Sequence, residues 1–212
     1  MKESKMQWVY SARTTDELRR RYDEWASDYD DDLDVQDEGY VSPRRAAEVV
    51  AKYVNKTGRV LDAGVGTGLT GEALSALGFD DLAGIDLSPA MLYEARKKGI
   101  YGELLQMVLG ERLDYFDDTF DAIVCVGTLA PDHAPASALG EFVRVARPGG
   151  CVVFTLQPDA YETEGFREWQ EALERAGKWR FLHRTEPFQA FPHADPQVMH
   201  QVWAYEVLDG RE

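Results

Sequence analysis

The sequence predicts an α/β fold in which helices cover both faces of a mostly parallel sheet. From Arg59 onward, short apolar runs typical of buried strands alternate with segments of helical periodicity. The strands are expected at residues 59–63, 82–86, 103–108, 120–126 and 151–156, and the helices at 68–77, 89–98, 135–146 and 163–176. Such alternation leaves consecutive strands parallel and brings their carboxyl ends to one edge of the sheet, where ligands bind.

Two further helices are expected before the first strand. Thr14 is followed by acidic residues at positions 16 and 17, which is the pattern of a helix start. Ser42 is expected to cap a second helix, with Pro43 at its first position, and this helix should run to about Val54.

The tail of the chain breaks the alternation. Residues 179–183 and 199–208 read as two strands without a helix between them, so they should pair antiparallel. Because 212 residues suit one domain of ordinary size, we expect a single domain. Its parts would be an N-terminal helical cap at 1–40, a ligand-binding core at 41–159, and a C-terminal helix with the antiparallel pair at 160–212.

Composition limits the expected partners. The chain has 38 acidic and 23 basic residues, and a surface with a net charge of −15 repels nucleic-acid backbones. No apolar run approaches the ~20 residues that span a bilayer, and the N-terminus lacks the apolar region of a secretory signal. We therefore expect a cytoplasmic protein that binds neither nucleic acid nor membranes. Cys125 and Cys151 lie in apolar runs and should be buried free thiols.

No metal site is expected. The acidic run from Asp28 to Glu38 would need glycine at its sixth position and glutamate at its twelfth to form an EF-hand loop, but Leu33 and Gly39 stand there. The four histidines lack the paired spacing of a zinc site. The acidic run is therefore interpreted as a solvated turn.

The segment 59–70 carries the strongest functional signal. An apolar strand ends at Asp62, and Gly64, Gly66 and Gly68 follow before a helix begins. Glycines let the backbone approach a ligand closely, and the free N–H groups at a helix start favour an anionic group. Asp62 favours a positive group in the same ligand. A sulfonium amino acid, with its carboxylate and ammonium groups, meets both demands.

Asp86 is the second element of this site. It ends the second expected strand about twenty residues beyond the glycine loop, where an acid can accept both hydroxyls of a ribose. Ser88 should cap the next helix, with Pro89 in its first turn. Leu87 and Met91 would then flank a flat, apolar adenine ring.

These motifs, together with the segments 119–129 and 139–154, resemble the signatures of class I S-adenosylmethionine (SAM)-dependent methyltransferases. The segment Tyr-Asp-x-Trp-Ala-x-x-Tyr-Asp at 22–30 resembles most the Williams–Beuren-region methyltransferase-like family. The resemblance implies a Rossmann-like, seven-stranded sheet of order 3-2-1-4-5-7-6 with the last strand antiparallel. It also implies SAM as cofactor, S-adenosylhomocysteine (SAH) as product, and a small molecule or protein side chain as acceptor.

The resemblance also implies a set of cofactor-binding residues. They are Tyr22, Tyr29, Asp62, Gly64, Gly66, Gly68, Asp86, Leu87, Met91, Met107, Val108, Leu109, Val126 and Gly127. Two positions depart from the family pattern. Val108 or Leu109 stands where many relatives carry an acid for the adenine amino group. The segment 126–129 replaces the Asp/Asn-Pro-Pro-aromatic motif of enzymes that methylate amino groups of DNA bases, which again argues against nucleic acid.

His133, just beyond the fourth strand, is the candidate catalytic residue, because a neutral imidazole can take a substrate proton near pH 7. Two other functions stay open. One is a protein that binds SAM or SAH without catalysis. The other is an NAD-dependent oxidoreductase, since Gly66, Gly68 and Gly71 also spell a G-x-G-x-x-G fingerprint, although that register starts two residues late.

Overall fold

The computed structural model describes residues 5–33, 39–130 and 133–210. Its strands are β1 Val60–Ala63, β2 Leu82–Asp86, β3 Glu103–Gln106, β4 Phe120–Cys125, β5 Ala146–Leu156, β6 Trp179–Arg184, β7 Phe188–Phe191 and β8 Asp195–Val207. Its helices are α1 Lys5–Tyr10, α2 Thr15–Trp25, α3 Tyr29–Asp32, α4 Ser42–Tyr53, α5 Leu69–Ala76, α6 Pro89–Lys97, α7 Ala138–Val145, α8 Pro158–Thr163 and α9 Phe166–Arg175.

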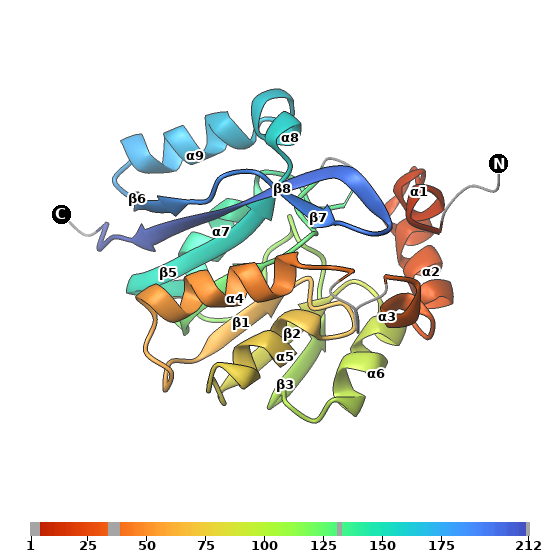
Figure 1. Cartoon of the computed structure of the whole chain (residues 1–212). Helices are drawn as coiled ribbons and strands as arrows, with labels where there is room; N and C mark the ends of the chain where they lie inside the picture. The colour runs from red at the N-terminus through yellow and green to blue at the C-terminus, as the bar shows by residue number, and fades with distance from the viewer. Residues whose placement is uncertain (1–4, 34–38, 131–132, 211–212) are drawn as a thin grey trace.

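The strands form one mixed sheet in the order β3-β2-β1-β4-β5-β8-β6, and β7 pairs with β8 beside this path (Figure 1). Strands β1 to β5 run parallel, whereas β8 is antiparallel to both β5 and β6. The expected order is confirmed, with β8 in the place of the seventh strand. The additional strand β7 has four residues, too few to produce a recognisable periodicity in the sequence.

Helices cover both faces of the sheet, as expected. On one face, Val50 of α4 and Leu74 of α5 belong to a buried cluster with Val124 of β4. On the other face, α7 and α9 contribute Phe142 and Phe166 to a second cluster. All four residues of β1 are buried, which fits a central strand of a parallel sheet. Both cysteines are buried free thiols, as predicted.

Some helix boundaries differ from the expected ones. The helix expected at 163–176 is α9, but it begins later than expected, at Phe166 after Gly165, whose φ is +78°; α8, which ends at Thr163, is not predicted. Glycine tolerates this left-handed conformation, which breaks the helix. Helices α1 and α3 are not predicted by the sequence; both are short. Every helix in the described ranges is too short or too polar to cross a bilayer.

The two predicted caps have different outcomes. Thr14 caps α2, because its side chain accepts a hydrogen bond from the N–H of Glu17 (3.1 Å). Ser42 is not the cap of α4; Val41 takes that position. The Ser42 hydroxyl instead lies 2.9 Å from Nδ1 of His200 in β8. A contact with a strand so distant in sequence replaces the local capping bond.

Tyr101 joins helix α5 to the end of strand β1. Its hydroxyl accepts a hydrogen bond from the N–H of Gly71 (3.1 Å) and donates one to Oδ2 of Asp62 (2.7 Å). A β-carbon on Gly71 would lie 2.1 Å from the tyrosine hydroxyl oxygen, closer than real atoms approach. Gly71 therefore permits the contact that holds Asp62 in place.

We expect Gly71→Ala to destabilise the protein by about 1–3 kcal/mol, because the added methyl group must displace Tyr101. Gly140→Ala in α7 is the matched control. A β-carbon there would meet only Trp169, at 3.7 Å, so its better helix propensity should stabilise the protein by about 0.5–1 kcal/mol. Chemical denaturation measures both free energies of unfolding. Equal stability of the two variants would contradict this account.

Candidate functional site

A cavity lies at the carboxyl ends of β1, β2, β3 and β4, with about 800 Å³ of space between its walls, part of it open to solvent. Of the residues predicted to bind the cofactor, all except Asp62 and Gly68 line it, and His133 lines it too. Residues from four strand ends and from the N-terminal helices thus meet in one place. Their roles in binding stay predictions.

The three glycines of the loop after β1 have left-handed backbone conformations. The φ angles of Gly64, Gly66 and Gly68 are +79°, +54° and +94°. A β-carbon on Gly64 would lie 2.4 Å from Oγ1 of Thr128, whereas one on Gly66 would meet no atom within 4 Å. Gly64 is therefore required by packing, and Gly66 leaves room for a ligand to approach the backbone. Gly68 is the N-cap residue of α5.

Asp86 organises both the glycine loop and the start of α6. Its Oδ2 accepts a hydrogen bond from the N–H of Gly66, and its Oδ1 accepts one from the N–H of Ser88, each at 2.8 Å. Burial raises the pKa of this carboxyl to about 6, and the two N–H groups partly offset that effect. Because Asp86 also lines the cavity, its carboxylate can accept hydrogen bonds from ligand hydroxyls.

Asp62 lies behind the glycine loop and is only 1% exposed. Tyr101 donates a hydrogen bond to its Oδ2, while Oδ1 has no hydrogen-bond partner in the described part of the chain. Burial raises the pKa of Asp62 to about 7, the bond from Tyr101 opposes this rise, and the nearby charge of Asp86 adds to it. The site therefore contains a buried acid with one unsatisfied acceptor oxygen.

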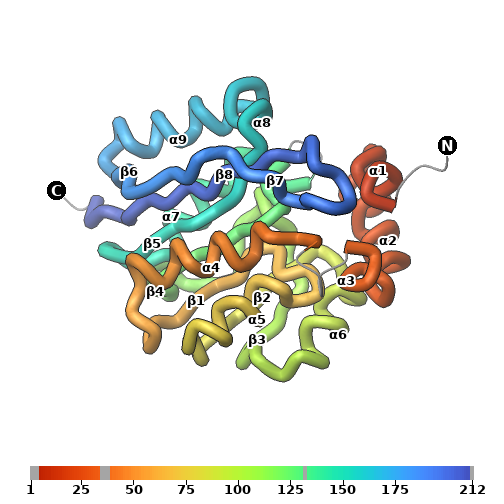
Figure 2. Tube along the Cα trace, in the orientation of Figure 1, coloured from red at the N-terminus to blue at the C-terminus, as the bar shows by residue number. Residues whose placement is uncertain are grey.

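Helices α1, α2 and α3, residues 5–33, form a lid at one end of the molecule (Figure 2). Tyr22 and Tyr29 of the lid line the cavity. The ring centroids of Trp25 and Tyr29 lie 4.7 Å apart, and these aromatic side chains pack with Phe191 of β7. The lid thus has its own small core, which extends to the C-terminal strands.

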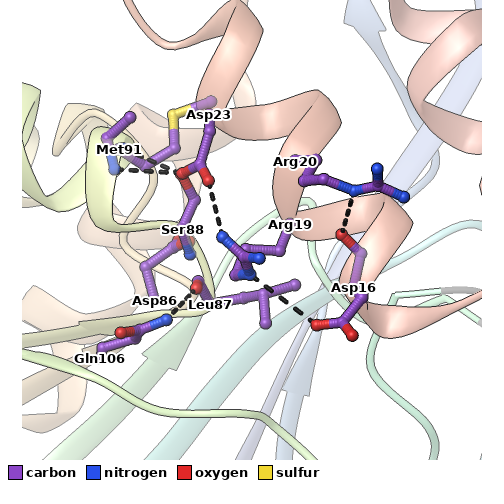
Figure 3. Close-up of polar contacts among 10 residues, drawn as sticks. Asp16, Arg19, Arg20, Asp23, Asp86, Leu87, Ser88, Met91 and Gln106 are labelled. Carbon is purple, nitrogen blue, oxygen red and sulfur yellow. Dashed lines mark hydrogen bonds and ion pairs between the residues drawn. The ribbon is translucent and has the colours of Figure 1, made fainter.

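Asp23 of the lid binds the start of α6 (Figure 3). Its Oδ1 accepts hydrogen bonds from Oγ of Ser88 (2.6 Å) and from the N–H of Ala90 (3.3 Å). Ser88 is the N-cap residue of α6, and its Oγ accepts a hydrogen bond from the N–H of Met91 (3.1 Å), as predicted. Arg19 pairs with Oδ2 of Asp23 at 3.0 Å. We call Asp23 and Ser88 the lid latch.

Asp30 makes a second attachment between the lid and the cavity wall. Its Oδ1 accepts a hydrogen bond from the hydroxyl of Thr67 in the glycine loop. Its Oδ2 forms an ion pair with Nζ of Lys98 at 3.0 Å. Lys98 also pairs with Glu72 of α5. The lid is therefore fastened to the loop after β1 as well as to α6.

The rest of the acidic run contributes no metal site to the described ranges. Asp28 and Asp32 pair with Lys5 at 2.8 and 3.0 Å. Asp34, Asp37 and Glu38 lie outside the residues that the structure describes. Among residues 5–33, 39–130 and 133–210, no group of three or more histidine, cysteine or acidic side chains is arranged to hold a metal ion.

His133 lies beside the cavity, in the loop after β4. Its ring makes edge contacts with Tyr10 and Tyr22 of the lid, with centroids 4.8 and 5.8 Å apart. Residues 131 and 132 of the same loop are outside the described ranges. The lid thus holds the imidazole at the cavity wall.

Tyr40 is a cavity residue that the sequence analysis missed. Its ring stacks on Phe191 with centroids 4.5 Å apart. Its hydroxyl lies against Gly127, where a β-carbon would be 2.2 Å from the oxygen. No local pattern marks Tyr40, because both of these contacts are distant in sequence.

Comparison with known proteins identifies the family. A methyltransferase-domain model matches residues 61–154. Human methyltransferase-like protein 27 is 37% identical over 169 residues, which cover 76% of this chain and 67% of that protein. The chain belongs to the SAM-dependent methyltransferases. SAM is the cofactor of this family, as the resemblance implied.

A second relative of the methyltransferase is phosphatidylethanolamine N-methyltransferase from Cereibacter sphaeroides. It is 39% identical over 145 residues, which cover 65% of this chain and 66% of that protein. The chain thus spans about two thirds of the length of these two curated relatives.

Solved structures share the fold of the methyltransferase. A TehB-like SAM-dependent methyltransferase from Corynebacterium glutamicum has a TM-score of 0.63 at 21% identity and covers 89% of this chain and 98% of its own. The [4+2]-cyclase SpnF has a TM-score of 0.67 at 17% identity, with coverages of 93% and 98%. At such identities these structures show the fold alone, and the cyclase shows that the fold serves more than one reaction.

Asp62 should make the stability of the methyltransferase depend on pH. An unfolded aspartate loses its proton near pH 4, whereas Asp62 in the folded chain keeps its proton up to about pH 7. Between these pH values the folded state binds one more proton than the unfolded state, so the contribution of Asp62 to stability falls as the pH rises. Asp62→Asn removes this charge. We expect the difference in free energy of unfolding, variant minus wild type, to increase by about 2–4 kcal/mol from pH 4.5 to pH 8. Urea denaturation measures it, and a constant difference would refute the raised pKa.

Asp23→Ala should weaken the lid latch. Losing a hydrogen bond to a charged group costs about 1–3 kcal/mol, so backbone amides of α2 should exchange with solvent about 5- to 150-fold faster. Glu24→Ala removes the same charge from the next, exposed residue and should leave exchange unchanged. Hydrogen–deuterium exchange compares the two variants. Identical exchange in both would show that the latch does not hold the lid.

Proposed function

We propose that this chain is an active methyltransferase that transfers the methyl group of SAM to a nucleophile on a small molecule or a protein side chain. The observation that carries the proposal is that the glycine loop, Asp86 and His133 meet at one cavity. SAM supplies an activated methyl group, and its transfer leaves SAH. The chain supplies binding groups, a closed environment and a proton acceptor.

The residues around the cavity fit SAM in polarity and shape. In this proposal Asp86 accepts hydrogen bonds from the ribose hydroxyls, and Leu87 and Met91 flank the adenine. Gly66 lies beside the amino-acid part, where its missing side chain leaves open space. The unsatisfied Oδ1 of Asp62, beside the glycine loop, supplies an acceptor for an ammonium group.

The adenine edge is the least polar part of the proposed site. Met107, Val108 and Leu109 follow β3 and line the cavity, and the N–H of Met107 donates to the carbonyl of Asp86 (3.0 Å). Their side chains offer no acid to the adenine amino group. Backbone carbonyls of this segment therefore take over that recognition in the proposal.

His133 takes the proton that the acceptor releases, and the lid excludes water. Tyr22 and Tyr29 close the cavity, and burial raises the pKa of both phenols, which keeps them uncharged. Because a sulfonium is already a good leaving group, positioning and desolvation contribute more than the strength of the base.

Two alternatives motivate direct tests. A protein that binds SAM or SAH without catalysis would have the same cavity, and the [4+2]-cyclase with this fold shows that methyl transfer does not follow from the fold. An NAD-dependent oxidoreductase would use Gly71 as the third glycine of its fingerprint. Gly71 instead packs against Tyr101 and lies outside the cavity lining, which disfavours that function.

Asp86→Asn should raise the Kd values of SAM and SAH about 10- to 100-fold, because the amide offers one neutral acceptor oxygen in place of a carboxylate. Asp80→Asn, at an exposed position, is the control and should bind like the wild type. Calorimetric titration with SAM, SAH and NADH measures the affinities. SAM affinity within threefold of wild type would remove Asp86 from the site. Binding of NADH without SAM would replace the proposed function.

A further inference from the structure

A second cavity adjoins the first and shares Gly127 and His133 with it. Its walls surround about 630 Å³ of space, part of which is open to solvent. Four parts of the chain form its walls: the end of α1, the loop after β4, the end of β5 and strand β8. We call it the acceptor chamber, because it meets the cofactor cavity at the candidate base.

His200 forms the β8 wall of the chamber. It is 5% exposed, and its Nδ1 lies 2.9 Å from the hydroxyl of Ser42, which fixes the ring. Burial lowers the pKa of His200 to about 4, so the imidazole is neutral at pH 7. The contact with Ser42 uses Nδ1, and Nε2 is the other polar atom of the ring. A ligand hydroxyl suits either tautomer of this ring, because a hydroxyl both donates and accepts.

The remaining polar groups of the chamber are neutral as well. Thr155 accepts a hydrogen bond from the N–H of Gly127 (2.8 Å), which holds the shared wall in place. Gln157 follows β5, and Tyr10, which is 39% exposed, lies at the mouth. Although the chain carries a net charge of −15, the described side chains that line this chamber include no aspartate, glutamate, lysine or arginine. Burying a charged ligand without an opposite charge is costly, so these walls favour an uncharged polar ligand.

We propose that the acceptor chamber binds the methyl acceptor, that the acceptor is a small uncharged molecule with a hydroxyl group, and that His200 positions this hydroxyl. The inference rests on the proposed function. The acceptor oxygen gains the bond to the methyl carbon, the carbon–sulfur bond breaks with its electrons on sulfur, and the hydroxyl proton passes to His133. His200 is a positioning residue, since His133 alone lines both cavities among the four histidines.

The proposal is tested with three ring compounds of similar size on the full chain saturated with SAH. Phenol is the neutral probe, benzoate the anion and benzylammonium the cation. We expect saturable phenol binding in the chamber, detected by ligand-observed NMR, and at least tenfold weaker binding of both charged probes. No phenol binding, or a charged probe binding within threefold of phenol, would overturn the proposal. A polypeptide that accepts methyl groups while phenol does not bind would make the acceptor a protein.

The role of His200 is tested with His200→Phe, which keeps a ring and removes its hydrogen bonds. We expect a phenol Kd at least tenfold higher and an SAH Kd within twofold of wild type. His183→Phe on β6, outside both cavities, is the matched control and should change neither value. Unchanged phenol affinity in His200→Phe would refute the positioning role.

Two further measurements keep the outcomes distinct. If His200→Phe does not fold, Gln157→Leu tests the β5 wall at a half-buried position, and we expect at least threefold weaker phenol binding. Wild-type phenol affinity in that variant would count against the chamber. Failure of the wild type to bind SAH would instead refute the proposed function, because the chamber is tested only in the SAH complex.

Discussion

Two buried carboxyl groups at the ends of adjacent strands organise the wall of the cavity beside the glycine loop. The parallel register of β1 and β2 brings Asp62 and Asp86 to the same edge of the sheet. Burying such groups is costly unless hydrogen bonds compensate, and the donors here are Gly66, Ser88 and Tyr101. The glycine loop, the start of α6 and the packing of α5 therefore all depend on the same pair of acids.

Ser88 connects this pair to the lid. Its N–H donates to Asp86, and its hydroxyl donates to Asp23 while accepting the capping bond from Met91. A lid that moves away from α6 must break a bond at the residue that also orients Asp86. The attachment of the lid and the geometry of Asp86 are therefore linked through one side chain.

The parts that the sequence predicted are those encoded locally. The loop from Asp62 to Gly68 and the cap at Ser88 each depend on residues within a few positions, and the strand order followed from family resemblance. The missed features depend on contacts between distant segments. Tyr40 meets Gly127, and Ser42 meets His200, so no window of the sequence contains either pair. The acceptor chamber, which four separated segments form, is invisible for the same reason.

Asp23, Asp86 and Asp62 lie close enough for their carboxyl groups to influence one another. Asp23 raises the pKa of Asp86, and Asp86 raises that of Asp62, so ionisation of one carboxyl group disfavours ionisation of the next. A bound cation relieves this repulsion. SAM carries one more positive charge than SAH, because the sulfonium becomes a neutral thioether on methyl transfer. In the proposed function, carboxylates near the cofactor therefore attract SAM more strongly than SAH, because only SAM carries the sulfonium charge.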